Sequence, residues 1–504
     1  MGGHYDKDIF KQLQEVLERS DRIEHEIREN KAEHKLELKQ QELKFKEEFN
    51  EERNRFNVRI SSLETELAVV KTENLLLHND NERMKRIINN DSSNSSLPPS
   101  TDQKGKGANT YNTREKSDKK CGGQIGHKGM TLTKQEVKNK IENGDFQHKV
   151  VTFGKEEGNY VSKYVLDLQI MTTATELRFY ADATGRIVVP KEYQSDVIYG
   201  PVIKSIAIDL YSEGAVSNDR IREFINAISG NKLKLSQGSI YGFCQAFAQK
   251  SEDSIAQIYE ELMNSKTVYT DSTTVTINGK QAHIRNQSIN NAVLYSPMGK
   301  KDIATLKVTG ILPKYCGTLV HDHETALYHF GTRHGECIVH LMRYLKKNTE
   351  ESKNAWSGKL TSLFSTMNVE RKKRISSDSV FTDLDISNYE DEYDRILLEG
   401  RSENKGTSGK YAKKEEKALL NRLKKYKENH LLFLHDFQVD FSNNMSERDL
   451  RKCKNRQKIS GGFRKQSGNE MYCNIMSVVE TCKRKEMKIF ESICNIFNGT
   501  PAIF

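Results

Sequence analysis

The sequence predicts an α/β protein that follows a long N-terminal helix. Three observations support this prediction. Residues 6–90 are rich in Glu, Lys, Arg, Gln and Leu and contain no Pro, which is typical of one continuous helix. Residues 267–321 contain strand-forming runs of Val, Tyr and Thr. Apolar residues at helical spacing precede these runs from residue 199 and follow them from residue 346.

Length and charge narrow the classes of protein that fit. The chain has 504 residues, a formal net charge of +9 and 30% charged residues, which suits several soluble domains. The excess of positive charge favours a polyanionic partner such as nucleic acid, although it equally fits a basic protein without one. We expect no membrane span and no signal peptide, because long apolar runs are absent. Eight cysteines without a disulfide-like rhythm favour a reducing cytoplasm.

The first domain, residues 1–90, is predicted to be a coiled-coil dimerisation helix. Its second half carries a heptad with alternating spacings of four and three: Phe56, Ile60, Leu63, Leu67, Val70, Asn74, Leu77, Asn81, Met84 and Ile88. Taking Leu63 as a d position places Asn74 and Asn81 at a, which favours a parallel dimer in fixed register. The first half is weaker, with Lys46 and Arg53 at a. A single solvated helix is the alternative.

Residues 91–130 are predicted to be a flexible basic linker, because Ser, Asn, Gly and Pro dominate them. Cys121 and His127 in this stretch, with His148 beyond it, are weak zinc candidates. A structural zinc site needs four ligands and usually a close Cys pair, and no CxxC is found here. Residues 131–198 contain short runs of strand-forming residues and are predicted to form a small β-rich module.

Residues 199–262 are predicted to be helical. Ser217 and Ser236 stand where N-caps are expected, and Gly230 closes the first of the two capped segments. Short helices joined by tight turns suit a helix-turn-helix that binds DNA. They suit equally an ordinary helical subdomain packed on the next domain.

Three acids stand out in the region that follows. Asp271 interrupts the strand-forming run of residues 267–276, where it is either a polar residue on an exposed face or a metal ligand projecting from a sheet. Asp322 ends the next strand-like run, GTLVHD. Glu447 lies near a predicted helix start, with Ser442 and Asn443 as candidate caps. Three carboxylates together suit two Mg²⁺ ions flanking a scissile phosphate, but spacing alone leaves this open.

Several segments together resemble the insertion-sequence-66 family of transposases, which belong to the DDE class and have an RNase H-like core. YTDSTTVTINGK resembles the first-aspartate motif, and GILPKYCGTLVHDHETALYHF with RHGECIVHLMRYL resembles the block around the second aspartate. FSNNMSERDLR resembles the motif that carries the catalytic glutamate. NSSLPPSTD, KKCGGQIGHKGMTL and YGPVIKSIAIDLY resemble segments nearer the N-terminus, so the likeness runs nearly end to end.

The resemblance implies an RNase H-like mixed sheet with flanking helices, formed by residues 263–345 and 441–504. Residues 346–440 are then a helical insertion, whose Lys-rich surface either holds DNA or is simply solvated. Asp271, Asp322 and Glu447 become the catalytic, metal-binding triad, with two Mg²⁺ as cofactors and Mn²⁺ as a substitute. The implied function is to hydrolyse a phosphodiester at element ends and to join the freed 3′-OH to target DNA. A catalytically inactive coiled-coil DNA-binding or assembly protein derived from a transposase is the alternative.

The resemblance also implies supporting residues near the triad. His334, Cys337 and His340 match an accompanying His/Cys pattern; Cys337 and His340 have metal-like spacing, but we favour a satisfied pair on a helix face. By resemblance Asn444 either supports the site or touches DNA, and the alternative is that it caps the helix. The family's zinc-finger region has paired cysteines that this sequence lacks, which argues against zinc.

The basic stretch after Glu447 is predicted to contact DNA phosphates. Its candidate residues are Arg448, Lys452, Lys454, Arg456, Lys458 and Arg464. Arg448 alternatively lies only on the helix surface. The expected partners are element ends and target DNA, accessory proteins, and further copies of the chain in a homodimer or higher oligomer, in a bacterial cytoplasm at the nucleoid and away from membranes.

Overall fold

A computed structural model describes residues 5–88, 132–153, 159–502 and 504. The chain divides into two compact units, of which the first is mainly the helix α1 (Tyr5–Ile88) and the second contains the sheet and the other helices. The linker predicted at 91–130, with Cys121 and His127, lies outside the described residues. No disulfide joins the cysteines of the described part of the chain. Nor does any described helix combine the length and apolar character needed to cross a bilayer.

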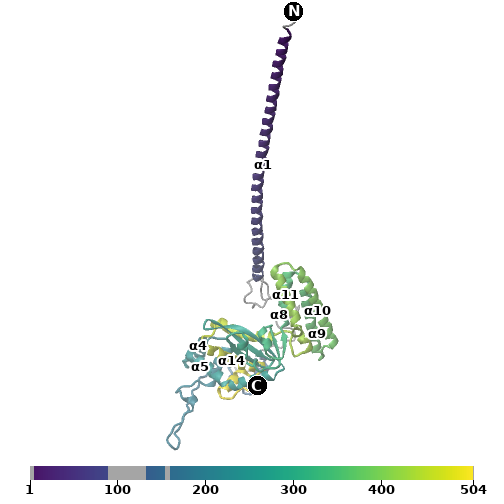
Figure 1. Ribbon diagram of the computed structural model, residues 1–504. Helices are drawn as coiled ribbons and strands as arrows, with labels where there is room; N and C mark the ends of the chain where they lie inside the picture. The colour runs from purple at the N-terminus through teal and green to yellow at the C-terminus, as the bar shows by residue number, and fades with distance from the viewer. Residues whose placement is uncertain (1–4, 89–131, 154–158, 503) are drawn as a thin grey trace. The chain divides into compact units, whose positions relative to one another are not determined.

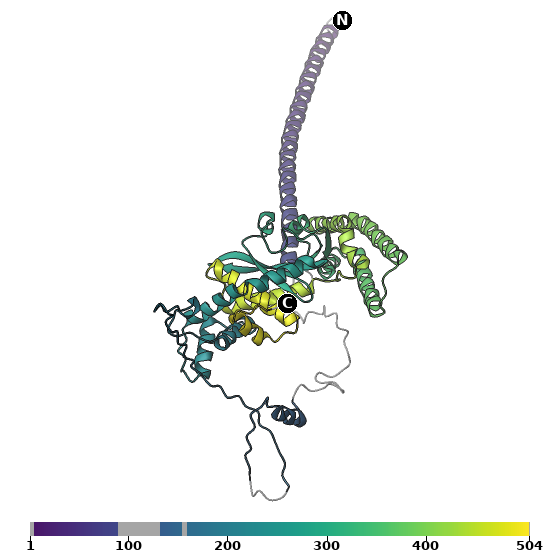
Figure 2. The ribbon, with the colours of Figure 1, turned by 90° about the horizontal axis from the view of Figure 1, so that it is seen from below.

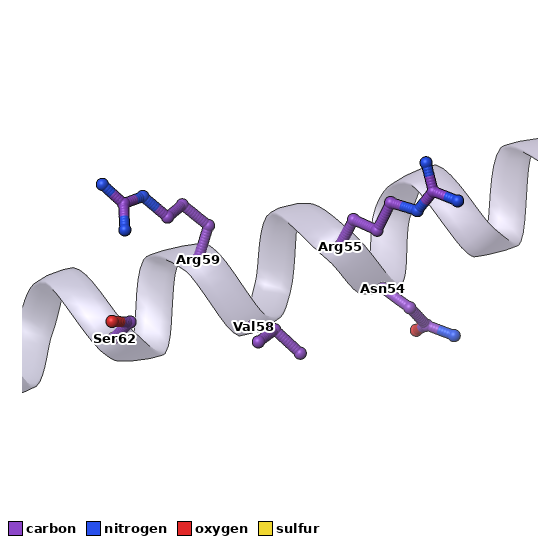
Figure 3. Close-up of a pocket in the computed structure, with 5 residues that line it drawn as sticks. All are labelled: Asn54, Arg55, Val58, Arg59 and Ser62. Atoms are coloured by element: carbon purple, nitrogen blue, oxygen red, sulfur yellow. The ribbon is translucent and has the colours of Figure 1, made fainter.

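Helix α1 is continuous over 84 residues, as the sequence predicts. The apolar side chains of its heptad are exposed in the single chain, from 47% for Leu63 to 64% for Phe56. Figure 3 shows one stretch of this helix, where Arg55 and Arg59 project from one side and Val58 from another. These side chains line an open helix surface. An uncovered apolar seam is what a coiled-coil partner would bury, but the dimer itself stays a prediction.

Residues 132–198 contain the helix α2 (Lys134–Glu142), which Thr133 begins with a capping box, and the short 3₁₀ helix η2 (Lys191–Tyr193). The other described residues of this segment form turns, bends and irregular chain and contain no strand of the sheet. The β-rich module expected at 131–198 therefore stays a prediction.

Four helices follow, where the sequence predicts a helical block: α3 (Pro201–Ser212), α4 (Asn218–Ile228), α5 (Gln237–Lys250) and α6 (Glu252–Asn264). The expected caps are present, because the Ser217 and Ser236 hydroxyls accept hydrogen bonds from the Arg220 and Ser239 amides. Ile208 and Phe247 of this block belong to the same buried core as residues of the C-terminal helices. This packing fits a helical subdomain docked on the next domain, and the helix-turn-helix role stays a prediction.

A mixed five-stranded sheet forms the centre of the second unit. Its strands are β1 (Thr267–Ile277), β2 (Lys280–Ser288), β3 (Val293–Met298), β4 (Thr318–His321) and β5 (Arg333–Glu336), in the order β3-β2-β1-β4-β5. The first three strands are antiparallel neighbours, whereas β4 pairs parallel to β1 and β5 pairs parallel to β4. The turn at Asn278-Gly279, where both residues have positive φ, joins β1 to β2 as the sequence predicts. The α/β class is thereby confirmed.

Helices cover both faces of this sheet. Side chains alternate between the faces of a strand, so Val268 and Leu319 enter one core while Tyr269 and Val320 enter another. The first core includes α3–α6, α13 (Asn444–Ser460), α14 (Gln466–Arg484) and α15 (Ile489–Phe497). The second includes α8 (Ile338–Ser352), α9 (Trp356–Ser376), α10 (Asp383–Gly406), α11 (Lys410–Lys425) and α12 (Lys427–His435). The short helices α7 (Ile303–Leu306) and η3 (Thr325–His329) connect strands.

The stretch between Lys346 and Asp440 is helical, as predicted, and it is built into the second core through Trp356, Phe364 and Leu431. Figure 1 and Figure 2 show α9–α11, in green, on one side of the sheet, with α4, α5 and α14 toward the other. The insertion thus contributes to burying the face of the sheet that carries Tyr269 and Val320.

Candidate active site

Asp271 lies in the middle of β1, opposite Asn286 of β2. Its amide donates to Asn286 Oδ1 at 2.9 Å, and its Oδ1 accepts from the Ser272 amide at 2.6 Å. The strand predicted around this acid is present, and Asp271 is half-buried rather than exposed. Asp271 therefore occupies the central strand of a sheet, where a charged carboxylate is costly without a partner.

Asp322 follows β4 directly, where the sequence places it. β4 runs parallel to β1, and Tyr269 pairs with Val320. Asp271 and Asp322 each lie two residues beyond this pair, so they come at the same level along the two strands. Asn443 joins the two strands, since its Nδ2 donates to Thr270 O at 3.0 Å and lies 3.5 Å from Asp322 Oδ1. The geometry brings the second acid beside the first.

Glu447 lies in the first turn of α13. Asn443 occupies the N-cap position, but no side chain caps this helix, because the Asn443 amide group points to the strands instead. The helix therefore begins where the sequence predicts, with Asn443 at the N-cap, but the predicted capping hydrogen bond from Ser442 or Asn443 is absent. Asn444 is the first helical residue rather than the cap and is exposed, so its role in supporting the site or touching DNA stays a prediction.

His340, in the first turn of α8, links the second and third acids. Its Nδ1 lies 3.2 Å from Asp322 Oδ2, and its Nε2 lies 3.5 Å from Glu447 Oε1. Cys337 is buried just before α8. Its Sγ lies 3.3 Å from His340 Nδ1 and accepts from the backbone N–H of Asn443 at 3.2 Å. Asp322, Cys337 and His340 each offer one ligand atom within 4.8 Å of the others.

His334 does not join this group. It lies on β5, with its Nδ1 3.3 Å from His321 Nε2, and its ring contacts the edge of Tyr328. The sequence pattern His334, Cys337 and His340 therefore includes residues from two separate sites: His334 lies beside His321 and Tyr328, whereas Cys337 and His340 lie beside Asp322. The reason is the strand end between them: β5 ends at Glu336 and α8 begins at Ile338, so the chain changes direction.

The electrostatics show how closely the groups are held. Burial and then the charge of Asp322 raise the pKa of Asp271 to about 7. Burial alone would raise the pKa of Asp322, but hydrogen bonding and charge from His340, with Asn443, hold it below its usual value. Burial alone would lower the pKa of His340, but Cys337 and Asp322 outweigh it and raise that pKa to about 11. Carboxylates pushed apart in pKa in this way are typical of functional sites.

The donor set fits divalent cations. Glu447 Oε1, Asn443 Oδ1 and Ser272 Oγ are buried oxygens without a hydrogen-bond partner among the described residues. Buried polar atoms are normally satisfied, so this deficit beside three carboxylates is unusual. Hard cations such as Mg²⁺ prefer carboxylate and carbonyl oxygens, and the thiol and imidazole of Cys337 and His340 add softer donors at one side.

The predicted DNA-contact residues divide into two groups. Arg448, Lys458 and Arg464 are exposed. Lys452 instead pairs with Glu213 at 2.8 Å and with Glu480, and the buried Arg456 donates to Val216 O at 2.7 Å. Lys452 and Arg456 therefore make contacts within the protein, and their contact with DNA stays a prediction.

Lys454 and Arg464 both lie near the part of β1 beyond Asp271. Lys454 Nζ donates to Thr274 O at 2.6 Å and is half-buried. Phe463 pairs with Ile277 at the end of β1, so its neighbour Arg464 lies about 20 Å along the strand from Asp271. If Arg464 contacts DNA, it does so away from the acids.

The sequence patterns missed several residues that contact the acids or their neighbours. Asn286, Arg285 and Ser288 on β2 are buried polar side chains, and Asp449 of α13 and Glu324 bond to them. The one sequence signal was the polar character of HIRNQS in a strand next to Asp271, and it is weak because a polar strand more often faces solvent.

Comparison with known proteins places the chain in a family. The sequence model of the transposase IS66 family matches residues 197–471, more than half of the 504 residues, and this span contains all three acids. No curated protein sequence matches the chain. Because the matched region covers the helical block, the sheet, the insertion and α13, the chain belongs to the transposase IS66 family.

Proposed function

We propose that this protein is a DDE-type transposase whose catalytic acids are Asp271, Asp322 and Glu447. Membership in a transposase family implies DNA binding together with DNA cleavage and transfer. The observation that carries the finer proposal is the meeting of three acids from β1, the end of β4 and the start of α13, with His340 between two of them. The strand order β3-β2-β1-β4-β5, with three antiparallel strands followed by two parallel ones, supports an RNase H-like core.

Asp271, Asp322 and Glu447 would hold two Mg²⁺ or Mn²⁺ ions. When bound, these ions supply Lewis-acid stabilisation of the attacking and leaving oxygens during in-line displacement at phosphorus. Asn443 and His340 hold the Asp322 carboxylate by its two oxygens, which limits its rotation before DNA arrives. The same site would serve two reactions, hydrolysis at the element end and transfer of the freed 3′-OH to target DNA, because both are displacements at phosphorus.

Exposed basic side chains would position the DNA. Arg448 is one residue from Glu447, and Lys458 lies three turns further along α13. Contacts of this kind are made to phosphates and are independent of sequence. The exposed heptad of α1 would bury its apolar side chains against a second copy, which would bring two catalytic units to one pair of element ends.

The test is Mg²⁺-dependent cleavage and strand joining on DNA that carries the element ends. Wild type is compared with Asp271→Ala and Glu447→Gln, and with Glu428→Gln on the exposed surface of α12 as a matched control. We expect both products to disappear in the first two variants and to remain in the control. Equal activity in all four proteins would refute the triad.

A further inference from the structure

Strand β2 is unusually polar for a strand beside the centre of a sheet. Arg285, Asn286, Gln287 and Ser288 are fully buried, and His283 is 7% exposed. A buried polar group is costly unless it is hydrogen-bonded. The bonds made by Arg285 and Asn286 lead in both cases to residues next to the three acids.

Asn286 connects the first acid to the helix that carries the third. Its Oδ1 accepts from the Asp271 amide at 2.9 Å, while its Nδ2 donates to Asp449 Oδ2 at 3.1 Å and lies 3.4 Å from Ser446 O. Ser446 and Asp449 flank Glu447 in the first turns of α13. One amide side chain thus spans the space between the Asp271 backbone and the turn of helix that presents Glu447.

Asp449 is itself firmly held. Ser288 Oγ donates to its Oδ2 at 2.7 Å, and Arg484 of α14 donates to its Oδ1 at 2.5 Å. The helix turn is therefore fixed against β2 by a carboxylate with donors on both oxygens. Asn286 consequently has a rigid partner on the α13 side.

Arg285 makes the corresponding link between the first two acids. Its Nη1 donates to Thr270 Oγ1 at 3.1 Å, one residue before Asp271. Its Nη2 lies 2.6 and 2.7 Å from the two oxygens of Glu324, two residues after Asp322. The Arg285 guanidinium is fully buried, and its bonds to Glu324 are charge-assisted hydrogen bonds, which are short and strong.

We propose that Asn286 and Arg285 are positioning residues that set the separations among the three acids. Asn286 fixes Glu447 relative to Asp271, and Arg285 fixes Asp322 relative to Asp271. Neither side chain touches a triad carboxylate in the described contacts; each acts through the backbone or through a neighbour. The inference rests on the proposed function, since it concerns the same metal site. Residues that orient metal ligands typically contribute 10–100-fold to metal affinity or activity.

The experiment measures Mn²⁺ binding to the full-length protein by titration calorimetry, together with kcat and KM for cleavage. Asn286→Leu removes the amide while keeping its size. Asn348→Leu is the matched control, because Asn348 is a buried asparagine whose described side-chain bonds go to Ser352, Ser357 and Glu416 and not to the three acids. Both variants should lower the melting temperature, but only Asn286→Leu should weaken Mn²⁺ binding, by about 10–100-fold, and lower kcat with little change in KM.

Arg285→Lys and Glu324→Gln provide a second line of evidence if Asn286→Leu does not fold. Lysine keeps the charge but cannot bond Thr270 and both Glu324 oxygens at once. Glu324→Gln keeps an oxygen that accepts from Arg285 but removes the anion beside a fully buried guanidinium, so its melting temperature is measured together with Mn²⁺ binding. Mn²⁺ affinity equal to that of wild type in these folded variants would overturn the inference.

The outcomes separate this inference from the proposed function. If wild type and Asp271→Ala bind Mn²⁺ equally, the proposed metal site is wrong, whatever the β2 variants do. If wild type binds and Asp271→Ala does not, while the β2 variants bind as wild type does, the triad stands and the positioning role fails.

Discussion

Two groups of buried charged residues lie near the β4–β5 end of the sheet, and they differ in how their acids are satisfied. In the first, Glu336 accepts from His323 at 2.9 Å and from Tyr328 at one oxygen, and from Arg422 at 2.6 Å at the other, with His430 3.3 Å away. In spite of burial, these partners hold the pKa of Glu336 far below its usual value.

The triad is the opposite case. Burial and a neighbouring acid raise the pKa of Asp271 to about 7, and Glu447 Oε1 has no hydrogen-bond donor among the described residues. A buried acid surrounded by donors holds the fold together, because its charge is already balanced. Neighbouring buried acids that raise one another's pKa and leave an oxygen without a donor favour an added cation. The comparison fits a structural role for Glu336 and supports the proposal that the three acids bind metal.

The largest expected effect separates activity from stability. Asp271→Asn should reduce cleavage by about 10³-fold, since losing a metal ligand costs about 4 kcal/mol of transition-state stabilisation. The metal-free variant should be at least as stable as wild type, because the repulsion between Asp271 and Asp322 is removed. Cleavage rates and urea unfolding without metal measure the two quantities. A variant that loses several kcal/mol of stability would place Asp271 with the structural acids.

Glu336→Gln should show the reverse pattern in stability. It leaves Arg422, whose side chain is only 17% exposed, without its anionic partner, and breaking such a pair typically lowers the free energy of unfolding by about 3 kcal/mol. Chemical denaturation measures the loss. Adding Arg422→Met should restore part of the stability, since both charges are then gone. If the double variant is less stable than Glu336→Gln alone, charge pairing is not what Glu336 provides.

The same contrast explains how far the sequence could predict the site. Asp271, Asp322 and Glu447 lie at recognisable places, within a β-prone run, at a strand end and near a helix start, but the resemblance to transposases is what singled them out. The network of β2 was not identifiable, because its polar residues are those of a solvated strand and its partner Asp449 lies 163 residues away. Only the paired sheet with α13 against it brings them together.

The features of the fold also differ in whether local sequence could predict them. Helix α1, the serine caps of α4 and α5 and the turn at Asn278-Gly279 follow from local residue preferences, and the structure contains them. Burial of the insertion against Tyr269 and Val320 depends on contacts distant in sequence, as does the cluster around Glu336, which takes Arg422 and His430 from α11 and α12. Local patterns carry no information on such pairs.

Glu416 of α11 extends the comparison to pH. Its oxygens accept from side chains that include Trp356, Asn354 and Asn404. Burial alone would raise its pKa, but these donors lower it to about 2 from 4.5. A depressed pKa stabilises the fold above the unfolded value of about 4.5 and loses that contribution as the pH falls toward 2. Wild type should thus be more stable than Glu416→Gln at pH 6, and the gap should shrink between pH 4.5 and 2. Thermal unfolding of both proteins across this range measures it, and a gap that stays constant would contradict the prediction.

The smallest expected effect concerns basic residues, and it compares an exposed lysine with one that is paired within the protein. Lys458 is exposed, whereas Lys452 is held by Glu213 and Glu480. Lys458→Ala should weaken binding to all DNA sequences about equally and reduce the salt slope of log K by about 1, because one phosphate contact is lost. Lys452→Ala should leave that slope nearly unchanged and lower stability instead, since Glu480 then lies mostly buried without its cation. Fluorescence anisotropy at several salt concentrations measures the slopes. If Lys452→Ala lowers the slope as much as Lys458→Ala, internally paired cations also contact DNA, and the distinction drawn from the acids does not extend to them.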